Sequence, residues 1–382
     1  MKKMIFLTVD IPDRLNSGYK IRTYHILKKL SKKYEIHILH VGDIEKDFNT
    51  FNNSYTFLHA RKKNIFNIFK SFFMQKPFLV FRYTPKNLNE AVTQIIKKYK
   101  IDTVYMNLTE YELSLEDERL CYMIDQHDYI SETMKNAYIA EKNILKKFIY
   151  YIEFKKFLVF ERKYYSEYDC ENNMIFSVKK EDERKTSQIV KKAKTITLEN
   201  GFDLARIENK IQNYKYNILF VGTSHPRNID ALKEFYFHVL PKIDKMILDN
   251  TYINIVGASN LKDLMFIDLK KYNISIHSFV ENMDDFYSYG SIVVLPYKMG
   301  GGSKLKVLEA FAHGVPVLGY DLTFSGIDET PSYFMCQDSN EIAEKIKVFS
   351  DENIYKEYSQ KCLNIAPKYD WNAILTKLDG IL

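Results

Sequence analysis

The chain has 382 residues, of which 46% are hydrophobic and 27% charged, with a formal net charge of +6. This length exceeds what one hydrophobic core normally supports, so we expect two domains, and the composition excludes a disordered chain. No apolar run approaches the ~20 residues that cross a bilayer, and the four widely spaced cysteines form no CxxC pair, which argues against a metal site or a disulfide framework.

Short apolar runs alternate with amphipathic segments along the first half of the chain. The run at residues 4–9 is too short for a signal peptide, so it predicts a buried strand and a cytoplasmic protein. Residues 19–33 and 141–166 have helical patterns. We predict the remaining strands of this half at residues 35–41, 101–106, 120–124, 174–178 and 195–198.

The second half repeats this scheme. We predict strands at residues 217–221, 252–256, 274–277, 291–295 and 316–319. Apolar strands that alternate with helices predict parallel sheets covered on both faces, and therefore an α/β protein with two Rossmann-like, doubly wound domains. The turn-forming run Asn200-Gly201-Phe202-Asp203 places the boundary near residue 205, giving an N-terminal domain at 1–204 and a C-terminal domain at 205–365. Residues 366–382 are expected to form a helix that packs back toward the first domain. Ligands of such domains lie in a cleft at the carboxyl ends of the strands.

The most informative segment follows the predicted strand at 291–295. Gly300, Gly301 and Gly302 lead into a helix that we expect from Lys304 to His313, with Ser303 as its N-cap. Free N–H groups at a helix start form an anion site, and Lys304 adds a full positive charge. Glu309 lies on the same helix, where its two carboxylate oxygens suit a ribose diol. The alternative is a tight surface loop in which Lys304 is solvated and Glu309 pairs with Lys306 or His313.

This segment resembles the signature G-G-G-[ST]-[KR]-L-K-x-L-E-A of family 4-like glycosyltransferases, also called glycosyl transferases group 1. Three other stretches are similar to motifs of the same subgroup. They are the loop after the strand at 217–221, the segment at 279–283, and the turn at 16–24.

The resemblance implies a GT-B fold and a hexosyl- or related glycosyltransferase of bacterial cell-surface polysaccharide or glycoconjugate synthesis, acting with retention and without a metal. It implies no cofactor, a nucleotide-diphosphate sugar as co-substrate (a UDP-sugar is expected), and a lipid-linked or saccharide acceptor. By position, Glu309 matches the glutamate that holds the ribose. The residues matching the diphosphate cradle and its surroundings are Gly300, Gly301, Gly302, Ser303, Lys304, Gly222, Thr223, Arg227, Gly18 and Tyr19. Gly301 stands where many members carry a second glutamate, and the first C-domain loop offers His225 and Arg227 in place of an Arg and a Lys.

A second candidate cluster follows the predicted strand at 120–124. His127 lies beside Asp125 and Asp128, where an imidazole can steady positive charge at the anomeric carbon. The resemblance places this histidine near the donor sugar, which makes His127, Lys304 and Glu309 the catalytic candidates. A capping and turn cluster is the alternative.

Two stretches combine lysines with aromatic residues. Residues 61–76 have Phe66, Phe69 and Phe73 at helical spacing, which suits a helix lying on an anionic membrane at the inner face of the cell, or equally one packed in a core. For residues 141–165 core packing is the preferred interpretation. The charge is dispersed without a recognised motif, which argues against nucleic-acid binding.

Two other functions remain open: a sugar-nucleotide 2-epimerase, and a non-catalytic GT-B-like subunit that binds a partner enzyme. A dehydrogenase is disfavoured because no G-x-G-x-x-G follows the first strand.

Overall fold

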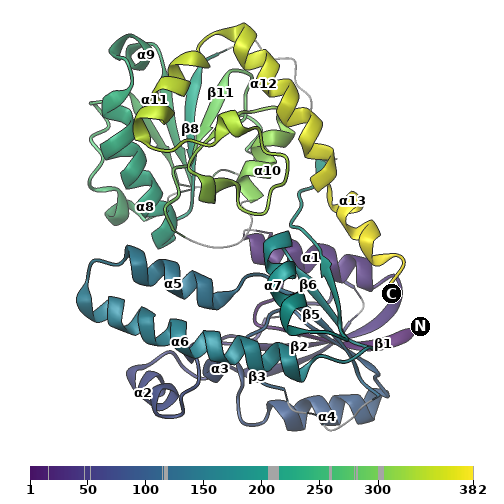
Figure 1. The fold of residues 1–382 in the computed structure, drawn as a ribbon. Coiled ribbons are helices and arrows are strands. Elements are labelled where there is room, and N and C mark those ends of the chain that lie inside the picture. The colour runs from purple at the N-terminus through teal and green to yellow at the C-terminus, as the bar shows by residue number, and fades with distance from the viewer. Residues whose placement is uncertain are drawn as a thin grey trace. The chain divides into compact units, whose positions relative to one another are not determined.

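The computed structural model describes residues 1–15, 17–46, 48–51, 53–113, 115, 119–204, 215–257, 260–278, 280, 283–299 and 305–381. The chain forms two compact units, one of residues 1–199 and 375–382 (unit 1), the other of residues 200–374 (unit 2). Each unit contains one parallel sheet with helices packed on it (Figure 1). In the described part of the chain, no helix is long and apolar enough to span a bilayer.

Unit 1 contains a seven-stranded sheet with the order β3-β2-β1-β4-β5-β6-β7, in which all neighbouring strands pair in parallel. Its strands are β1 (Lys2–Thr8), β2 (Tyr34–Gly42), β3 (Ser54–His59), β4 (Thr103–Met106), β5 (Cys121–Gln126), β6 (Met174–Ser177) and β7 (Lys194–Thr197). Its helices are α1 (Gly18–Leu30), α2 (Ile65–Phe73), α3 (Phe78–Tyr83), α4 (Leu88–Tyr99), α5 (Ile130–Ala140), α6 (Ile144–Glu167) and α7 (Lys180–Ile189). The strand β3 is an addition to the predicted set.

Hydrogen bonds and charges at the two ends of α1 explain where this helix begins and ends. The Ser17 hydroxyl accepts a hydrogen bond from Lys20 N at 3.4 Å and so caps α1, and Lys28 and Lys29 in the last turn suit the negative end of its dipole. One face of the sheet carries a core that includes Leu88, Val104 and Tyr164, which are almost fully buried. Helices α4 and α6 therefore cover this face.

Unit 2 contains a five-stranded parallel sheet with the order β10-β9-β8-β11-β12. Its strands are β8 (Asn217–Val221), β9 (Tyr252–Val256), β10 (Ile274–His277), β11 (Ser291–Val294) and β12 (Val317–Leu318). Its helices are α8 (Pro226–Glu234), α9 (Lys245–Asp249), α10 (Leu305–Ala312), α11 (Ser339–Val348), α12 (Glu352–Ile365) and α13 (Trp371–Leu375). The last of these ends at the passage of the chain back into unit 1.

The two lysine- and aromatic-rich stretches differ from ordinary core helices. On α2 only Ser71 is buried, and Phe66 and Phe73 are 70% and 80% exposed, so the core interpretation of this segment is wrong. On α6 the second half is buried through Phe157, Tyr164 and Tyr165, as predicted. The first half is different, because Ile144 and Phe148 are largely exposed.

Candidate functional site

In unit 2, the first loop after β8 is held by its own side chains. A Cβ atom on Gly222 would lie 3.0 Å from the Cβ of Asn228 and from the ring of Phe220, so this position favours glycine. The Asn228 amide nitrogen donates to the carbonyl oxygen of Thr223 at 3.0 Å and to its hydroxyl at 3.1 Å. The predicted loop residues Gly222 and Thr223 thus lie at the carboxyl end of a central strand.

Lys306 connects this loop to α10. Its ammonium donates to Val221 O at 2.7 Å and to the Tyr297 hydroxyl at 2.8 Å, and that hydroxyl donates to Asn228 Oδ1 at 2.8 Å. Tyr297 is 1% exposed, so these bonds lie in a largely dry environment. The network fixes α10 against the β8 loop. Lys306 therefore holds α10 and the β8 loop together through these hydrogen bonds and does not pair with Glu309.

Positive charge gathers beside the same loop. His225 caps α8 by accepting a hydrogen bond from Arg227 N at 3.3 Å. Partial burial, followed by the charges of Arg227 and Lys306, lowers the pKa of His225 below its ordinary value. Arg227 and Lys306 thus both act at one end of the sheet, and such a field attracts anionic groups.

Glu309 lies on α10 with one oxygen already oriented. The Tyr287 hydroxyl donates to its Oε2 at 3.2 Å, and the Tyr287 ring stacks on His313 with centroids 4.9 Å apart. His313 lies 3.3 Å from Asp284 and so also does not pair with Glu309. Burial raises the pKa of Glu309, which the Tyr287 hydrogen bond opposes. The carboxylate is held in a fixed position with acceptor capacity to spare.

The predicted cradle of Gly300, Gly301, Gly302, Ser303 and Lys304 lies outside the described residues. The described part of α10 begins at Leu305, directly after it.

In unit 1, Gly18 and Tyr19 form the start of α1, where first-turn N–H groups have no acceptor within the helix. The Tyr19 hydroxyl is engaged inside the unit, 2.6 Å from the Thr8 hydroxyl and accepting from Asn107 Nδ2 at 3.0 Å. Only the backbone of Tyr19 is therefore available to an anion at this helix start.

His127 lies at the end of β5, beside a buried ion pair. Arg22 donates to Asp125 through Nε at 2.9 Å and Nη2 at 2.6 Å, and both side chains are fully buried. Nε2 of His127 lies 3.3 Å from Asp125 Oδ2, and its ring is 5.3 Å from that of Tyr19. The structure thus brings His127 and Tyr19 together in unit 1.

Several residues of these sites have no sequence signal of their own. Folding of the chain brings Tyr287 and Tyr297 into contact with the site residues. Asn107 joins β1 to α1 by donating to the Thr23 hydroxyl at 2.8 Å. Asn107 follows the predicted strand at 101–106, and that position was the available clue. Among the described residues, no cluster of three or more His, Cys, Asp or Glu is arranged to hold a metal ion.

Comparisons with known proteins agree with this architecture. Residues 215–351 match the model of the family described as glycosyl transferases group 1. A comparison with curated proteins gave no match.

Solved structures match over the whole chain. Sucrose-phosphate synthase from Thermosynechococcus elongatus has a TM-score of 0.67 at 14% identity, covering 100% of this chain and 98% of its own. WaaG, a glycosyltransferase involved in lipopolysaccharide biosynthesis, has a TM-score of 0.65 at 12% identity, with 99% of each chain covered. Anabaena HepE in complex with UDP has a TM-score of 0.67 at 11% identity, covering 100% and 99%. The chain therefore has the GT-B fold with two Rossmann-like domains, and its second half matches the group 1 family of glycosyltransferases.

Proposed function

We propose that the protein transfers a sugar from a nucleotide-diphosphate sugar to an acceptor hydroxyl, with a UDP-sugar as donor. The observation that carries this proposal is Glu309, which is oriented by Tyr287 within the family-matched part of the chain and lies on the same helix as Lys306, whose charge acts together with that of Arg227 on His225. A carboxylate beside a cationic anion site suits a ribose diol joined to a diphosphate. The similarity to HepE, which binds UDP in its solved structure, supports the choice of base.

In the proposed mechanism the donor is held mainly by unit 2 and the acceptor by unit 1. The glycine loop, the start of α10 and Lys304 stabilise the charge on the departing diphosphate. The acceptor hydroxyl attacks from the face that the diphosphate leaves, so the configuration at the anomeric carbon is retained. A β-phosphate oxygen of the departing diphosphate takes the proton of the acceptor. His127 steadies the positive charge that develops at the anomeric carbon. No metal is required.

The first test is a thermal-shift screen of UDP-, GDP-, TDP- and CMP-sugars. We expect one UDP-sugar to stabilise the protein, because a ligand that binds only the folded state raises its stability. Stabilisation by none of these sugars would support the non-catalytic alternative, and interconversion of the free sugar nucleotide without an acceptor would support the epimerase.

Lys304→Ala is expected to lower the transfer rate about a hundredfold while the protein folds normally, since in the proposed mechanism this charge stabilises the leaving group. Turnover of the stabilising donor with a saccharide or lipid-linked acceptor measures this. Lys356→Ala, on the exposed side of α12, removes the same charge elsewhere in unit 2 and should leave turnover within twofold. Equal turnover in both variants would refute the role of Lys304.

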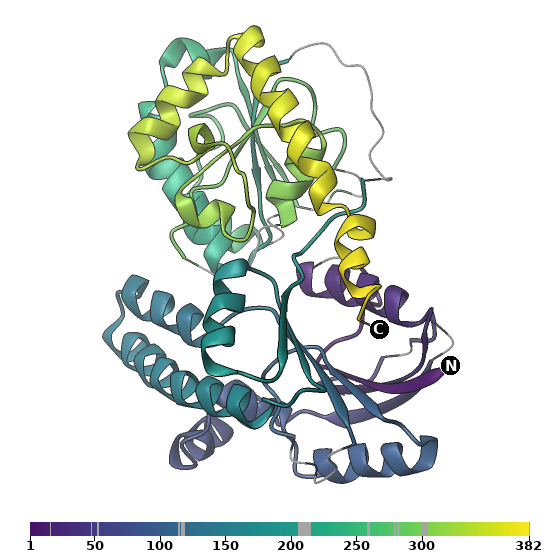
Figure 2. The same cartoon turned by 45° about the vertical axis from the view of Figure 1, so that its right-hand side comes forward.

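We also propose that unit 1 docks on an anionic membrane through an apolar and basic surface made of α2 and the first half of α6. Helix α2 lies beside α6 in both views (Figures 1 and 2), and at the middle of α6 the ammonium of Lys156 lies 3.5 Å from Ser71 O and over the Phe72 ring. The exposed apolar residues of the surface are Ile65, Phe66, Ile68, Phe69, Phe72, Phe73, Met74, Ile144, Leu145, Phe148 and Ile149. The exposed lysines beside them are Lys62, Lys63, Lys70, Lys142 and Lys146. Apolar side chains ringed by lysines suit the interface of a bilayer with anionic lipids, where a lipid-linked acceptor lies.

The double variant Phe69→Asp/Phe73→Asp is expected to weaken vesicle binding at least tenfold, because burying one phenylalanine contributes about 1.5–3 kcal/mol. Cosedimentation with vesicles containing anionic phospholipid measures this binding. Met265→Asp changes an equally exposed apolar residue in unit 2 and serves as the control. Unchanged binding of the double variant would exclude this surface.

A further inference from the structure

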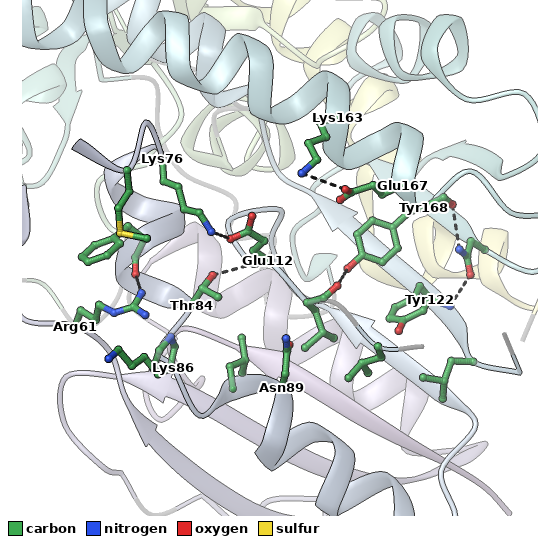
Figure 3. Close-up of a pocket in the computed structure, with 18 of the residues that line it drawn as sticks. Arg61, Lys76, Thr84, Lys86, Asn89, Glu112, Tyr122, Lys163, Glu167 and Tyr168 are labelled. Atoms are coloured by element: carbon green, nitrogen blue, oxygen red, sulfur yellow. Dashed lines mark hydrogen bonds and ion pairs between the residues drawn. The ribbon is translucent and has the colours of Figure 1, made fainter. Parts of the chain in front are cut away.

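Unit 1 contains a large cavity that none of the proposed catalytic residues line. Its volume is about 870 Å³, within the range of small-molecule sites. One wall comes from the segment between α2 and α4 and includes Met74 and Lys76, and the opposite wall comes from the end of α6 (Figure 3). Apolar side chains from α4 and the neighbouring loops complete the lining, among them Leu88, Leu113 and Leu120.

The polar groups of the cavity are unevenly distributed. Figure 3 shows Arg61, Lys76, Thr84 and Lys86 together on one side, with Glu112 as the nearest carboxylate. Glu112 already forms an ion pair with Lys76. Across the cavity, Lys163 and Glu167 neutralise each other at 3.4 Å. Counting the residues that the structure describes, the first side therefore carries an excess of positive charge.

Arg61 contributes a cation that has lost part of its hydration. Burial lowers its pKa, and the charge of Glu112 only partly opposes this. The guanidinium donates to Phe81 O and lies 4.3 Å from the centre of the Phe81 ring. Among the described residues Arg61 has no carboxylate of its own as an ion-pair partner, and such a half-buried guanidinium is stabilised by a phosphate, which suits its fork of donors.

Two further groups can donate to an anion at the same place. The Thr84 hydroxyl accepts from Glu112 N at 3.0 Å, so its own proton remains available. Among the described residues, Lys86 has no ion-pair partner and is exposed.

The cavity adjoins the proposed membrane surface. Met74 directly follows α2, is half exposed and also lines the cavity, as does Lys76 two residues later. A ligand that enters from a docked membrane meets an apolar lining and a cationic rim. We propose that this cavity binds one anionic phospholipid, with its phosphate on Arg61, Thr84 and Lys86 and part of an acyl chain on the apolar lining. The inference rests on the membrane contact proposed for unit 1 and is independent of the transfer reaction.

The test uses a short-chain phosphatidic acid at concentrations at which it stays monomeric, titrated against the full chain by isothermal calorimetry. We expect binding of one lipid per chain. Lys86→Glu should weaken lipid binding at least fivefold, because one lysine near an anionic lipid strengthens binding about fivefold and the variant reverses the charge. Lys97→Glu makes the same change at the other end of α4, away from the cavity, and should alter binding less than twofold.

The remaining outcomes overturn the proposal. Equal weakening by Lys86→Glu and Lys97→Glu would show a general charge effect, and equally tight binding of inorganic phosphate would show a phosphate site without a lipid. Absence of lipid binding to the unmodified chain would exclude the site. Because the lipid is monomeric, these results are separate from vesicle docking by α2 and from sugar transfer, so failure of either proposal can be recognised.

Discussion

Replacing Arg22 with methionine is expected to lower the free energy of unfolding of unit 1 by about 3–5 kcal/mol, because it leaves the buried Asp125 carboxylate without its partner. Arg22 also donates through Nη1 to Leu198 O at 2.9 Å and to Glu199 O at 3.1 Å. These carbonyls belong to the last residues of unit 1 before the chain enters unit 2. The same substitution therefore also removes the hydrogen bonds that hold Leu198 and Glu199 in place.

Hydrogen exchange of the amides in β1 and β5 measures this loss locally, so unfolding of unit 2 does not interfere. The matched control is the double variant Arg22→Met/Asp125→Leu. It removes both charges, and most of the lost stability should return because replacing a buried ion pair with apolar groups is often close to neutral. A loss below about 1 kcal/mol in the single variant would show that the pair does not hold the unit together.

The loss should also depend on pH. Burial by itself would raise the pKa of Asp125, but the charge of Arg22 and then that of His127 outweigh it and hold the pKa below the ordinary 3.8. A lowered pKa in the folded state contributes stability that is fully present above the unfolded pKa of about 3.9 and is lost only as the pH falls through the lower folded pKa. In the Arg22→Met variant, burial still raises the pKa of Asp125, and the charge of His127 is left to oppose it. The difference from the unmodified protein should therefore be larger at pH 7 than at pH 4.

Strands with continuous apolar runs could be predicted closely from the sequence. β8, β9 and β10 have the predicted bounds, and the signal is clearest in the central strand β8, where four of the five residues are buried. β3 was missed because it is an edge strand whose residues are only half-buried, so it lacks an apolar run. The apolar stripe of α2 was recognised, but a stripe has the same spacing whether it faces a core or solvent, so its exposure could not be read from the sequence.

The residues of the candidate sites likewise fall into two groups, those with a sequence motif and those that only the structure reveals. Glu309 and the Gly222 loop have local motifs and were found through the resemblance. The partners that position them come from distant parts of the chain, as Tyr287 does for Glu309 and Arg22 does for Asp125. No local pattern encodes such a pairing, because each partner is selected only once the strands and helices have packed. Sequence motifs therefore selected the candidate residues, and the structure shows which side chains hold them in position.

Glu161→Gln is expected to stabilise unit 1 by about 3 kcal/mol at pH 8 and to have little effect at pH 5. Glu161 lies on α6, is almost fully buried, and accepts hydrogen bonds from Ser131 N at 3.0 Å and from the Ser131 hydroxyl. Burial raises its pKa from 4.5 to about 7, despite these hydrogen bonds. At about 1.4 kcal/mol for each pH unit, that difference corresponds to ~3 kcal/mol.

The sign follows from which form the folded protein prefers. Because the folded pKa is raised, the contribution of Glu161 to stability is fully present below pH 4.5 and is lost as the pH rises through about 7. Glutamine keeps the shape of the neutral acid but cannot ionise: its amide oxygen accepts from Ser131 N, and its amide nitrogen donates to the Ser131 hydroxyl oxygen. The free energy of unfolding of unit 1, obtained from hydrogen exchange at several pH values, should therefore fall less steeply from pH 5 to pH 8 in the variant. Glu167→Gln changes an exposed carboxylate on the same helix and should leave the slope unchanged. If Glu161→Gln follows the same slope as the unmodified chain, the buried carboxyl is compensated by its surroundings, and the stability of unit 1 does not respond to its ionisation.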